Sequence, residues 1–303
     1  MKKNLEFLSK ALSLLPEVKE TLVPPKEGQF FSKPLGKGDS VTIDFGKHLV
    51  GHLQVKMGYV NSHPDAPVWI RFSFAENLKE FEENVENYQG WICSAWVQQE
   101  QLHFDLIPGE YVKIDILDIS SKFNLVIEDV MAIALSSADD SKLKPYHNVH
   151  KELEQIDHIA CHTLHDCMQK VFEDGPKRDR RLWMGDLRLQ ALANYETYQM
   201  NDMVKGCLYL FAALPMQNGQ VGACVFLEPE PEVDDTSMFD YSLLFVAALW
   251  DYYVETKDRE ALEDLWETAK MQIVLAQKQV GNDGVVKDCN KLGWCFLDWS
   301  LEL

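Results

Sequence analysis

The segment from residue 174 to residue 186 gathers the side chains of this sequence that are best suited to chemistry. It reads Asp-Gly-Pro-Lys-Arg-Asp-Arg-Arg-Leu-Trp-Met-Gly-Asp, with three carboxylates, four cations and one tryptophan. A carboxyl group can act on a glycosidic oxygen, and an arginine can hold a carboxylate bidentately. The face of an indole can cover the apolar side of a pyranose. We therefore take Asp174, Asp179 and Asp186 as candidate catalytic residues, and Arg178 and Trp183 as candidate sugar-binding residues.

The same residue types have a second interpretation. A salt-bridged turn between two helices also mixes acids with arginines, and Trp183 would then be a core residue. Residue types alone do not separate these two interpretations.

The elements on both sides of this segment are expected to be helices. Gly175-Pro176 ends the preceding helix, and Asp186 stands where the next helix begins, a place that favours negative charge. The first helix has an apolar stripe made of Val149, Leu153, Ile156, Ala160, Leu164, Met168 and Val171. Further helices are predicted at residues 187–198, 203–214, 238–254 and 259–280. Paired helices with short connections predict an array of α-hairpins or a toroid.

The preceding part of the chain has the period of β-strands. Apolar and polar residues alternate around residues 41–45, 53–57, 68–74, 112–116 and 123–135. Short strands separated by turns predict an antiparallel β-sandwich. The expected fold class is α+β multidomain, with an N-terminal helix and connector at 1–38, the sandwich at 39–143 and a helical domain at 144–303.

Composition narrows the classes of partner. A net charge of −19 would repel phosphate backbones, so nucleic acid is not expected as a partner. Charged residues interrupt the N-terminal apolar run, so neither a signal peptide nor a membrane span is expected, and the protein is predicted to be cytoplasmic. The seven cysteines form no C-x-x-C pair, which predicts reduced thiols rather than disulfides or a zinc ribbon.

The segment resembles a motif of the α-L-rhamnosidase family of glycoside hydrolases. The matching positions are Asp174, Pro176, Arg178, Asp179, Arg181, Trp183, Gly185 and Asp186. Two upstream stretches, residues 43–51 and 74–76, resemble strands of the sandwich that precedes the catalytic domain in that family. Residues 293–299 resemble a family segment at the edge of the sugar pocket, which makes Asp298 and Trp299 candidate substrate-binding residues.

The resemblance implies an (α/α)6 toroid that removes a terminal α-L-rhamnosyl or similar deoxysugar with inversion. No cofactor is expected. The chain departs from the family at two points. Arg180 occupies the position of the general acid, and an arginine does not deliver a proton at neutral pH. Either Asp174, Asp179 or Asp186 replaces the acid, or the site is silent. The chain also ends after about five barrel helices, so we expect a partial toroid whose partner is a complementary barrel half or a second copy.

Three weaker candidates complete the prediction. Asp240 follows an acidic loop and is a candidate for substrate binding, although a solvated loop explains the acids equally well. His158, His162 and His165 recur at helical spacing, but three histidines on one helix need ligands from elsewhere to bind one ion, so no metal site is expected. Trp91 and Trp96 fit an accessory glycan surface or the sandwich core.

The sequence is compatible with three functional hypotheses. The first is an exo-acting glycoside hydrolase with a carbohydrate substrate. The second is a carbohydrate-binding protein that keeps Arg178, Trp183 and Asp186 but has lost its acid. The third is an inert fragment. The first two hypotheses differ in whether Asp174 or Asp179 can be protonated near neutral pH. Pairing with an arginine would keep the carboxyl ionised and would oppose acid catalysis.

Overall fold

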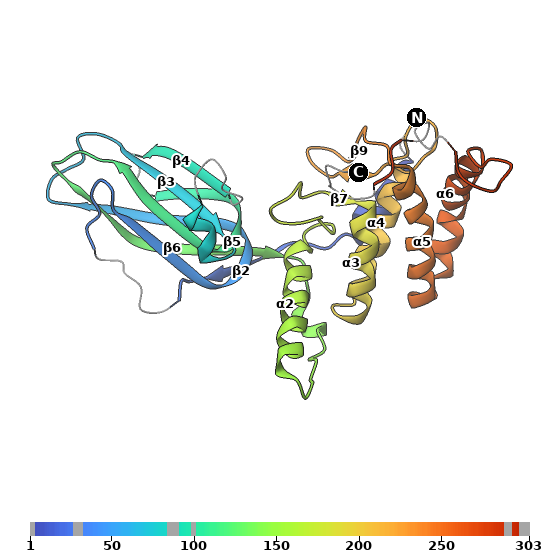
Figure 1. Ribbon diagram of the computed structural model, residues 1–303, viewed down its shortest axis with the longest axis horizontal. Helices are drawn as coiled ribbons and strands as arrows, with labels where there is room; N and C mark the ends of the chain where they lie inside the picture. The colour runs from blue at the N-terminus through green and yellow to red at the C-terminus, as the bar shows by residue number, and fades with distance from the viewer. Residues whose placement is uncertain (1–3, 27–32, 84–90, 98–100, 288–292, 297–303) are drawn as a thin grey trace. The chain divides into compact units, whose positions relative to one another are not determined.

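The computed structural model describes residues 4–26, 33–83, 91–97, 101–287 and 293–296 (Figure 1). The chain forms two compact units. One comprises Val18–Ser136, and the other comprises Met1–Glu17 together with Ser137–Leu303. The fold is an antiparallel β-sandwich followed by part of a helical toroid, as the sequence predicts.

The β unit is one hydrogen-bonded sheet with the strand order β1-β6-β2-β5-β3-β4. Its strands are β1 (Lys19–Val23), β2 (Ser40–Val60), β3 (Val68–Ala75), β4 (Trp91–Val97), β5 (Gln101–Asp118) and β6 (Asn124–Ser136), and a 3-10 helix, η1 (Leu78–Glu82), follows β3. Among the described residues, neighbouring strands of this sheet pair in the antiparallel sense.

The sheet folds over on itself because its longest strands serve both layers. The first part of β2 pairs with β5, residues 51–56 lie between β5 and β6, and residues 57–60 pair with β6. Register shifts interrupt the β2–β5 ladder between Asp44 and Leu49 and between Gly51 and Leu53, and such irregularities bend a strand. Val23 at one edge of the sheet and Phe72 on β3 belong to one hydrophobic cluster. A flat sheet would keep these strands apart, so the two layers enclose one core.

The helical unit contains α1 (Leu5–Leu14), α2 (Lys151–Cys167), α3 (Met184–Glu196), α4 (Asn201–Ala213), α5 (Phe239–Thr256) and α6 (Arg259–Gln277). A 3-10 helix, η3 (Asp140–Lys142), precedes α2, and β7 (Leu182–Trp183), β8 (Cys224–Phe226) and β9 (Glu232–Val233) form a small sheet. From α3 onward the helices lie within a few residues of the predicted ranges.

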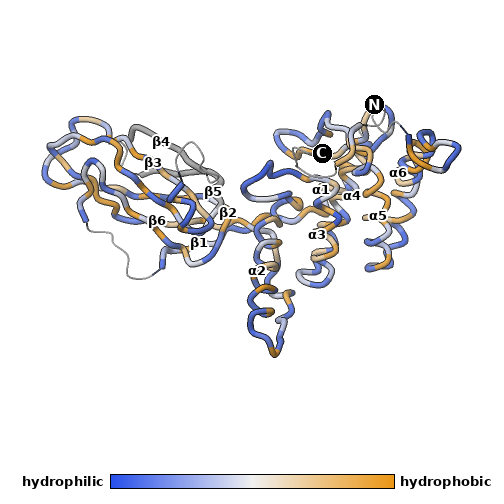
Figure 2. Tube along the Cα trace, viewed as in Figure 1, coloured by the Kyte–Doolittle hydropathy of each residue, from blue (hydrophilic) through white to orange (hydrophobic). Residues whose placement is uncertain are grey.

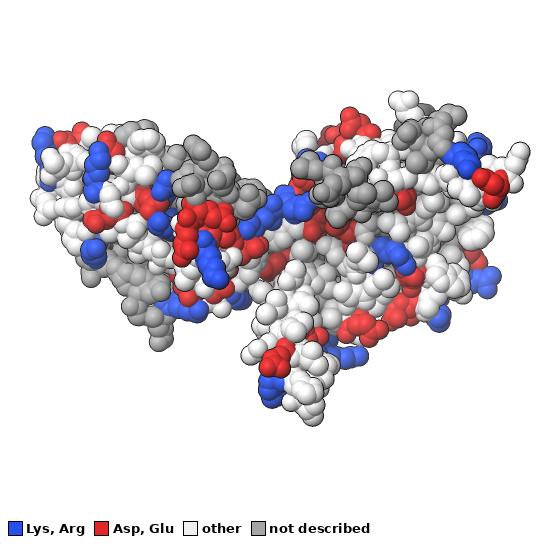
Figure 3. All heavy atoms as spheres, in the orientation of Figure 1, with Lys and Arg blue, Asp and Glu red and all other residues white. Residues whose placement is uncertain are grey.

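Helix α4 is the centre of this unit. From Gly206 to Ala213 every residue is buried, as expected for a helix that is apolar on all sides. Figure 2 shows the apolar colouring of α4 and α5. Acidic and basic side chains are interspersed on the face that Figure 3 presents. Among the described helices, none is both long and apolar enough to cross a bilayer.

The observed unit boundaries differ from the predicted residues 39 and 143. Strand β1 pairs with β6 through its backbone, but only Val23 of β1 is buried, so no alternation marked it in the sequence. Helix α1 belongs to the helical unit rather than to a separate connector. Ala11 on α1 is fully buried, and Lys10 donates to Glu260 and Asp264 on α6 at 2.5 and 2.8 Å.

Ala11→Leu should therefore loosen α1 from the helical core. We expect it to lower the free energy of unfolding of this unit by about 1–3 kcal/mol, because the buried site has no room for three more carbon atoms. Urea unfolding followed by circular dichroism measures the change. Ser9→Leu, at an exposed position of the same helix, is the matched control, and an equal effect of both substitutions would contradict the packing described here.

Candidate functional site

The loop between α2 and α3 is organised around the carboxylate of Asp174. Its Oδ1 accepts the backbone N–H of Arg181 at 2.9 Å, and its Oδ2 accepts that of Asp179 at 3.3 Å. The backbone N–H of Asp174 donates in turn to the carbonyl of Arg181 at 3.0 Å. Asp174 thus closes the loop on itself and fixes where Arg178 and Asp179 stand.

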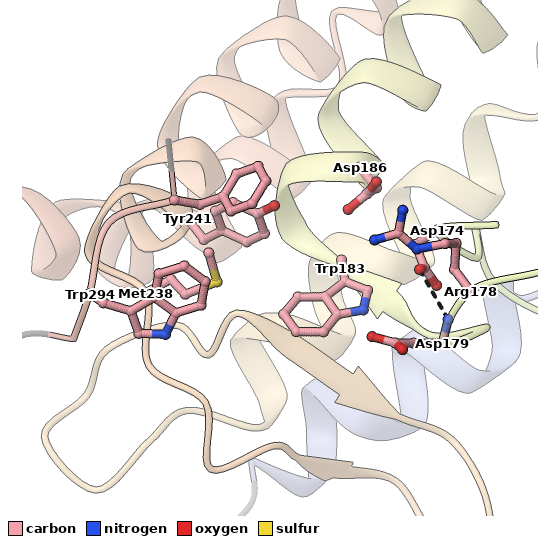
Figure 4. A pocket seen from close by; sticks show the side chains of 9 residues that line it. Asp174, Arg178, Asp179, Trp183, Asp186, Met238, Tyr241 and Trp294 are labelled. Carbon is pink, nitrogen blue, oxygen red and sulfur yellow. Dashed lines mark hydrogen bonds between the residues drawn. The ribbon is translucent and has the colours of Figure 1, made fainter. Parts of the chain in front are cut away.

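A pocket of about 310 Å³ opens beside this loop (Figure 4). Five of its lining residues come from the segment that the sequence singled out, and four come from the N-cap and first turn of α5 and from the 293–296 segment. The lining consists of Asp174, Arg178, Asp179, Trp183, Asp186, Met238, Tyr241, Trp294 and Phe296. The volume lies at the lower end of the range of small-molecule sites.

One wall of the pocket is aromatic. Trp183 and Tyr241 meet edge to face with ring centroids 6.3 Å apart, and Phe296 stands at 6.2 Å from both Tyr241 and Trp294. Such edge-to-face pairs are favourable arrangements of aromatic rings. In Figure 4 the carboxylates and Arg178 lie on the other side of Trp183. The pocket therefore offers an apolar face and a charged face, which suits the two sides of a sugar ring.

The aromatic wall depends on two glycines. A Cβ on Gly185 would lie 2.6 Å from Cζ of Tyr241, so the phenol reaches its place only because this residue has no side chain. Gly293 has φ +103, and a Cβ there would lie 1.9 Å from the carbonyl oxygen of Ser237. Only glycine combines this backbone conformation with such a close approach.

Asp240 positions the aromatic wall rather than lining the pocket. Its Oδ1 accepts the backbone N–H of Phe296 at 3.2 Å, and the carbonyl of Trp294 accepts the N–H of Phe239 at 3.0 Å. The 293–296 segment is therefore held on the first turn of α5. Asp298 and Trp299, which the sequence proposed for substrate binding, lie outside the described residues.

Comparison with known families assigns the chain. Residues 18–134 match the glycosyl hydrolase family 78 alpha-rhamnosidase N-terminal domain. Residues 147–302 match the bacterial alpha-L-rhamnosidase 6 hairpin glycosidase domain. The chain belongs to the α-L-rhamnosidase family. A search of curated proteins found no match.

Solved structures agree with this assignment. A rhamnosidase from Klebsiella oxytoca with rhamnose bound is 35% identical, with a TM-score of 0.91 over 100% of this chain and 65% of its own. A GH78 family rhamnosidase of Bacillus sp. GL1 is 16% identical, with a TM-score of 0.69 over 97% of this chain and 28% of its own. The Streptomyces avermitilis alpha-L-rhamnosidase complexed with L-rhamnose is 15% identical, with a TM-score of 0.61 over 88% and 25%. The last two show the fold alone.

In this α-L-rhamnosidase-like chain, Arg180 turns away from the pocket. It is absent from the lining, its Nε donates to the carbonyl of Pro176 at 2.8 Å, and its backbone has φ 54. Burial lowers the pKa of this guanidinium, while the nearby Glu173 carboxylate raises it. Burial in turn raises the pKa of Glu173 to about 7, against the opposing effect of Arg180. Glu173 does not line the pocket either.

Asp186 is the carboxyl in the pocket lining whose proton affinity is altered most clearly. Burial, followed by repulsion from Asp174, raises its pKa to about 6. Arg178 opposes this shift through its positive charge. The carboxyl of Asp186 therefore keeps its proton in a mildly acidic medium. The side chain of Asp179 is exposed.

Sequence reasoning missed Met238, Tyr241, Trp294 and Phe296 as lining residues. A partial signal existed for two of them, because Trp294 and Phe296 lie in the segment that resembles the edge of the family's sugar pocket. Tyr241 stands next to Asp240, so the sequence pointed to the correct turn of α5 but to the wrong side chain as its lining residue.

Gly185→Ala should displace Tyr241. The new methyl group would overlap the phenol ring, and we expect a loss of about 1–3 kcal/mol in the free energy of unfolding. A double-mutant cycle with Tyr241→Leu measures the coupling, since the smaller side chain relieves the overlap. Strictly additive effects would show that the ring does not lie against Gly185.

The raised pKa of Asp186 predicts a pH-dependent cost of folding. The folded chain holds this proton more tightly than the unfolded chain, whose carboxyl has the ordinary value of 3.8, so stability falls as the pH rises from about 4 to about 6. Asp186→Asn should be more stable than the wild type at pH 8 by on the order of 1 kcal/mol, after discounting for partial exposure. Near pH 4 the difference should shrink.

Urea unfolding at the two pH values measures this difference. Asp235→Asn, at an exposed acidic position, is the control and should show neither effect. A variant at residue 186 that is less stable than the wild type at pH 8 would rule out burial as the cause.

Proposed function

We propose that the pocket binds a terminal α-L-rhamnosyl or similar deoxysugar, and that the chain hydrolyses its glycosidic bond with Asp186 as the proton donor. The observation that carries this proposal is that a carboxyl with a pKa of about 6 and an aromatic wall line the same pocket. Two solved relatives in the family are described with rhamnose bound.

Each wall has a part in this proposal. The aromatic face, with Trp183 at its centre, covers the apolar side of the sugar, and Arg178 and the carboxylates accept or donate hydrogen bonds to hydroxyl groups. Asp186 protonates the leaving oxygen, because a general acid works best when its pKa is near the working pH. Arg180 takes no part, since it faces Pro176 and Glu173.

Hydrolysis with inversion also needs a carboxylate that activates water. Such pairs stand roughly 6.5–9.5 Å apart in inverting enzymes. Both oxygens of Asp174 already accept backbone N–H groups, so this residue supports the loop. Asp179 lines the pocket and is exposed, and we assign the water-activating role to it.

A second function is favoured by the arginine at the position of the family's acid. A site that lacks an effective proton donor would still hold a sugar between Trp183, Arg178 and Asp186. The chain would then be a carbohydrate-binding protein without hydrolytic activity.

Release of nitrophenol from an aryl α-L-rhamnoside tests the hydrolytic function. We expect kcat/KM to fall as the pH rises above about 6, because the donor loses its proton. Asp186→Asn should lower kcat by at least about 100-fold, and Asp235→Asn should leave it unchanged. NMR of the first sugar released should show the inverted anomer.

Binding measurements separate the two functions. Calorimetry with L-rhamnose should show binding that Trp183→Ala weakens by at least about tenfold, in line with about 1.4 kcal/mol of lost contact. Binding without turnover in the folded wild type would establish the carbohydrate-binding function. The absence of both binding and turnover would refute both functions.

A further inference from the structure

A second cluster of chemically active side chains lies on the C-terminal half of α2, outside the pocket. The ligand atoms of His162, His165 and Asp166 all lie within 4.8 Å of one another. Nδ1 of His165 is 3.1 Å from Oδ1 of Asp166, and Nε2 of His162 is 3.7 Å from its Oδ2. One carboxylate thus faces two imidazoles, one with each oxygen.

The helix brings these residues together through its own period. Residues separated by three and four positions lie on one face of a helix, which places His162 next to both His165 and Asp166. The two imidazoles stack with centroids 5.4 Å apart and an interplanar angle of 18°. Both rings therefore present their edges to the same carboxylate.

We propose that His162, His165 and Asp166 bind a divalent transition-metal ion of the zinc type. Two imidazole nitrogens and one carboxylate oxygen are a common ligand set for zinc. With bonds of roughly 2.0–2.1 Å, the ligands of a tetrahedral ion stand about 3.3 Å apart. The two nitrogen–oxygen distances lie on either side of this value, at 3.1 Å from His165 to Oδ1 of Asp166 and at 3.7 Å from His162 to Oδ2. Because they involve different oxygens, one imidazole must turn toward the oxygen that binds the ion.

Burial makes the site more than a surface cluster. The side chain of Asp166 is 4% exposed, and those of His162 and His165 are 26% and 19% exposed. The carboxylate is therefore withdrawn from water while the imidazoles reach the surface. This arrangement gives an ion a path of entry and leaves a fourth position for water or a small ligand.

A second carboxylate has the position of an outer partner. Oδ1 of Asp140 on η3 is 4.0 Å from Nε2 of His165. The two nitrogens of His165 thus face two different carboxylates. Ligating histidines commonly turn their other nitrogen toward a carboxylate, which fixes the tautomer and the direction of the ring.

The sequence predicts no metal in this region, because three histidines on one helix need a further ligand and the paired signature of a zinc site is missing. In the structure, His158 stacks on His162 with centroids 6.5 Å apart but is not part of the cluster. Asp166 takes its place as the third ligand. The proposed role is structural, because a bound ion would fix the end of α2 that leads toward the 174–186 loop. This proposal does not depend on the proposed hydrolytic function.

Metal binding to the full chain tests the proposal directly. After treatment with a chelator and dialysis, titration with Zn²⁺ in a calorimeter should show one equivalent bound, and Co²⁺ should give the visible absorption of a low-symmetry site with nitrogen and oxygen ligands. The midpoint of thermal unfolding should rise with Zn²⁺, because the ion binds the folded state.

Variants separate this site from adventitious binding. His162→Gln and His165→Gln should each weaken Zn²⁺ binding by at least about tenfold, and Asp140→Asn should weaken it by about tenfold through the orientation of His165. His158→Gln is the matched control on the same helix and should bind like the wild type. Both glutamine variants sit at partly exposed positions, and their circular dichroism shows whether they fold.

Two results would overturn the proposal. One is a wild-type chain that binds no Zn²⁺, which would leave a metal-free His–Asp–His cluster. The other is equal Zn²⁺ affinity in the wild type, His162→Gln and His165→Gln, which would place the ion elsewhere.

Discussion

The pocket depends on the two hydrogen bonds that the carboxylate of Asp174 accepts from the backbone of its own loop. They hold the chain between α2 and α3 in a closed turn, so that Arg178 and Asp179 stand at the pocket and Arg180 turns to the other side. Backbone N–H groups are fixed donors, and a carboxylate that accepts several of them is a stable centre for a loop. The acid at the first motif position therefore fixes the shape of the loop.

Two carboxyl groups next to this loop have a raised pKa but lie in different surroundings. Glu173 lies beneath it beside Arg180, and Asp186 lies in the pocket beside Asp174, yet burial raises the pKa of both. Only Asp186 is placed where a ligand can reach it. A perturbed carboxyl points to function when it also lines a cavity, and this combination distinguishes the two residues.

Much of the architecture was readable from the sequence because it follows from periodicity. Alternation marked β2, β3, the second half of β5 and β6, and apolar stripes marked α3 to α6 to within a few residues, but β4 was not predicted. Strand β1 escaped because four of its five residues are exposed and only its backbone pairing defines it. The charged half of the pocket was readable from one motif, since its residues are neighbours in sequence. Met238 and Tyr241 were not, because their place in the lining depends on how α5 packs against α3.

The roles of single side chains were the least accessible to sequence reasoning. Asp240 has the right position but uses its carboxylate on the backbone of Phe296. His158 has the same spacing as the other histidines of α2, yet the neighbour that completes the cluster is Asp166. Spacing predicts which face a residue occupies, and the surrounding elements decide what it contacts.

The edge of the aromatic wall has a further consequence for how the pocket can evolve. Because Trp294 and Phe296 rest on the first turn of α5 and not on the 174–186 loop, the part of the aromatic wall beyond Trp183 is encoded in a separate stretch of the gene. Substitutions in the later stretch can reshape this part of the wall while leaving the charged side of the pocket intact, so the two sides are free to evolve at different speeds.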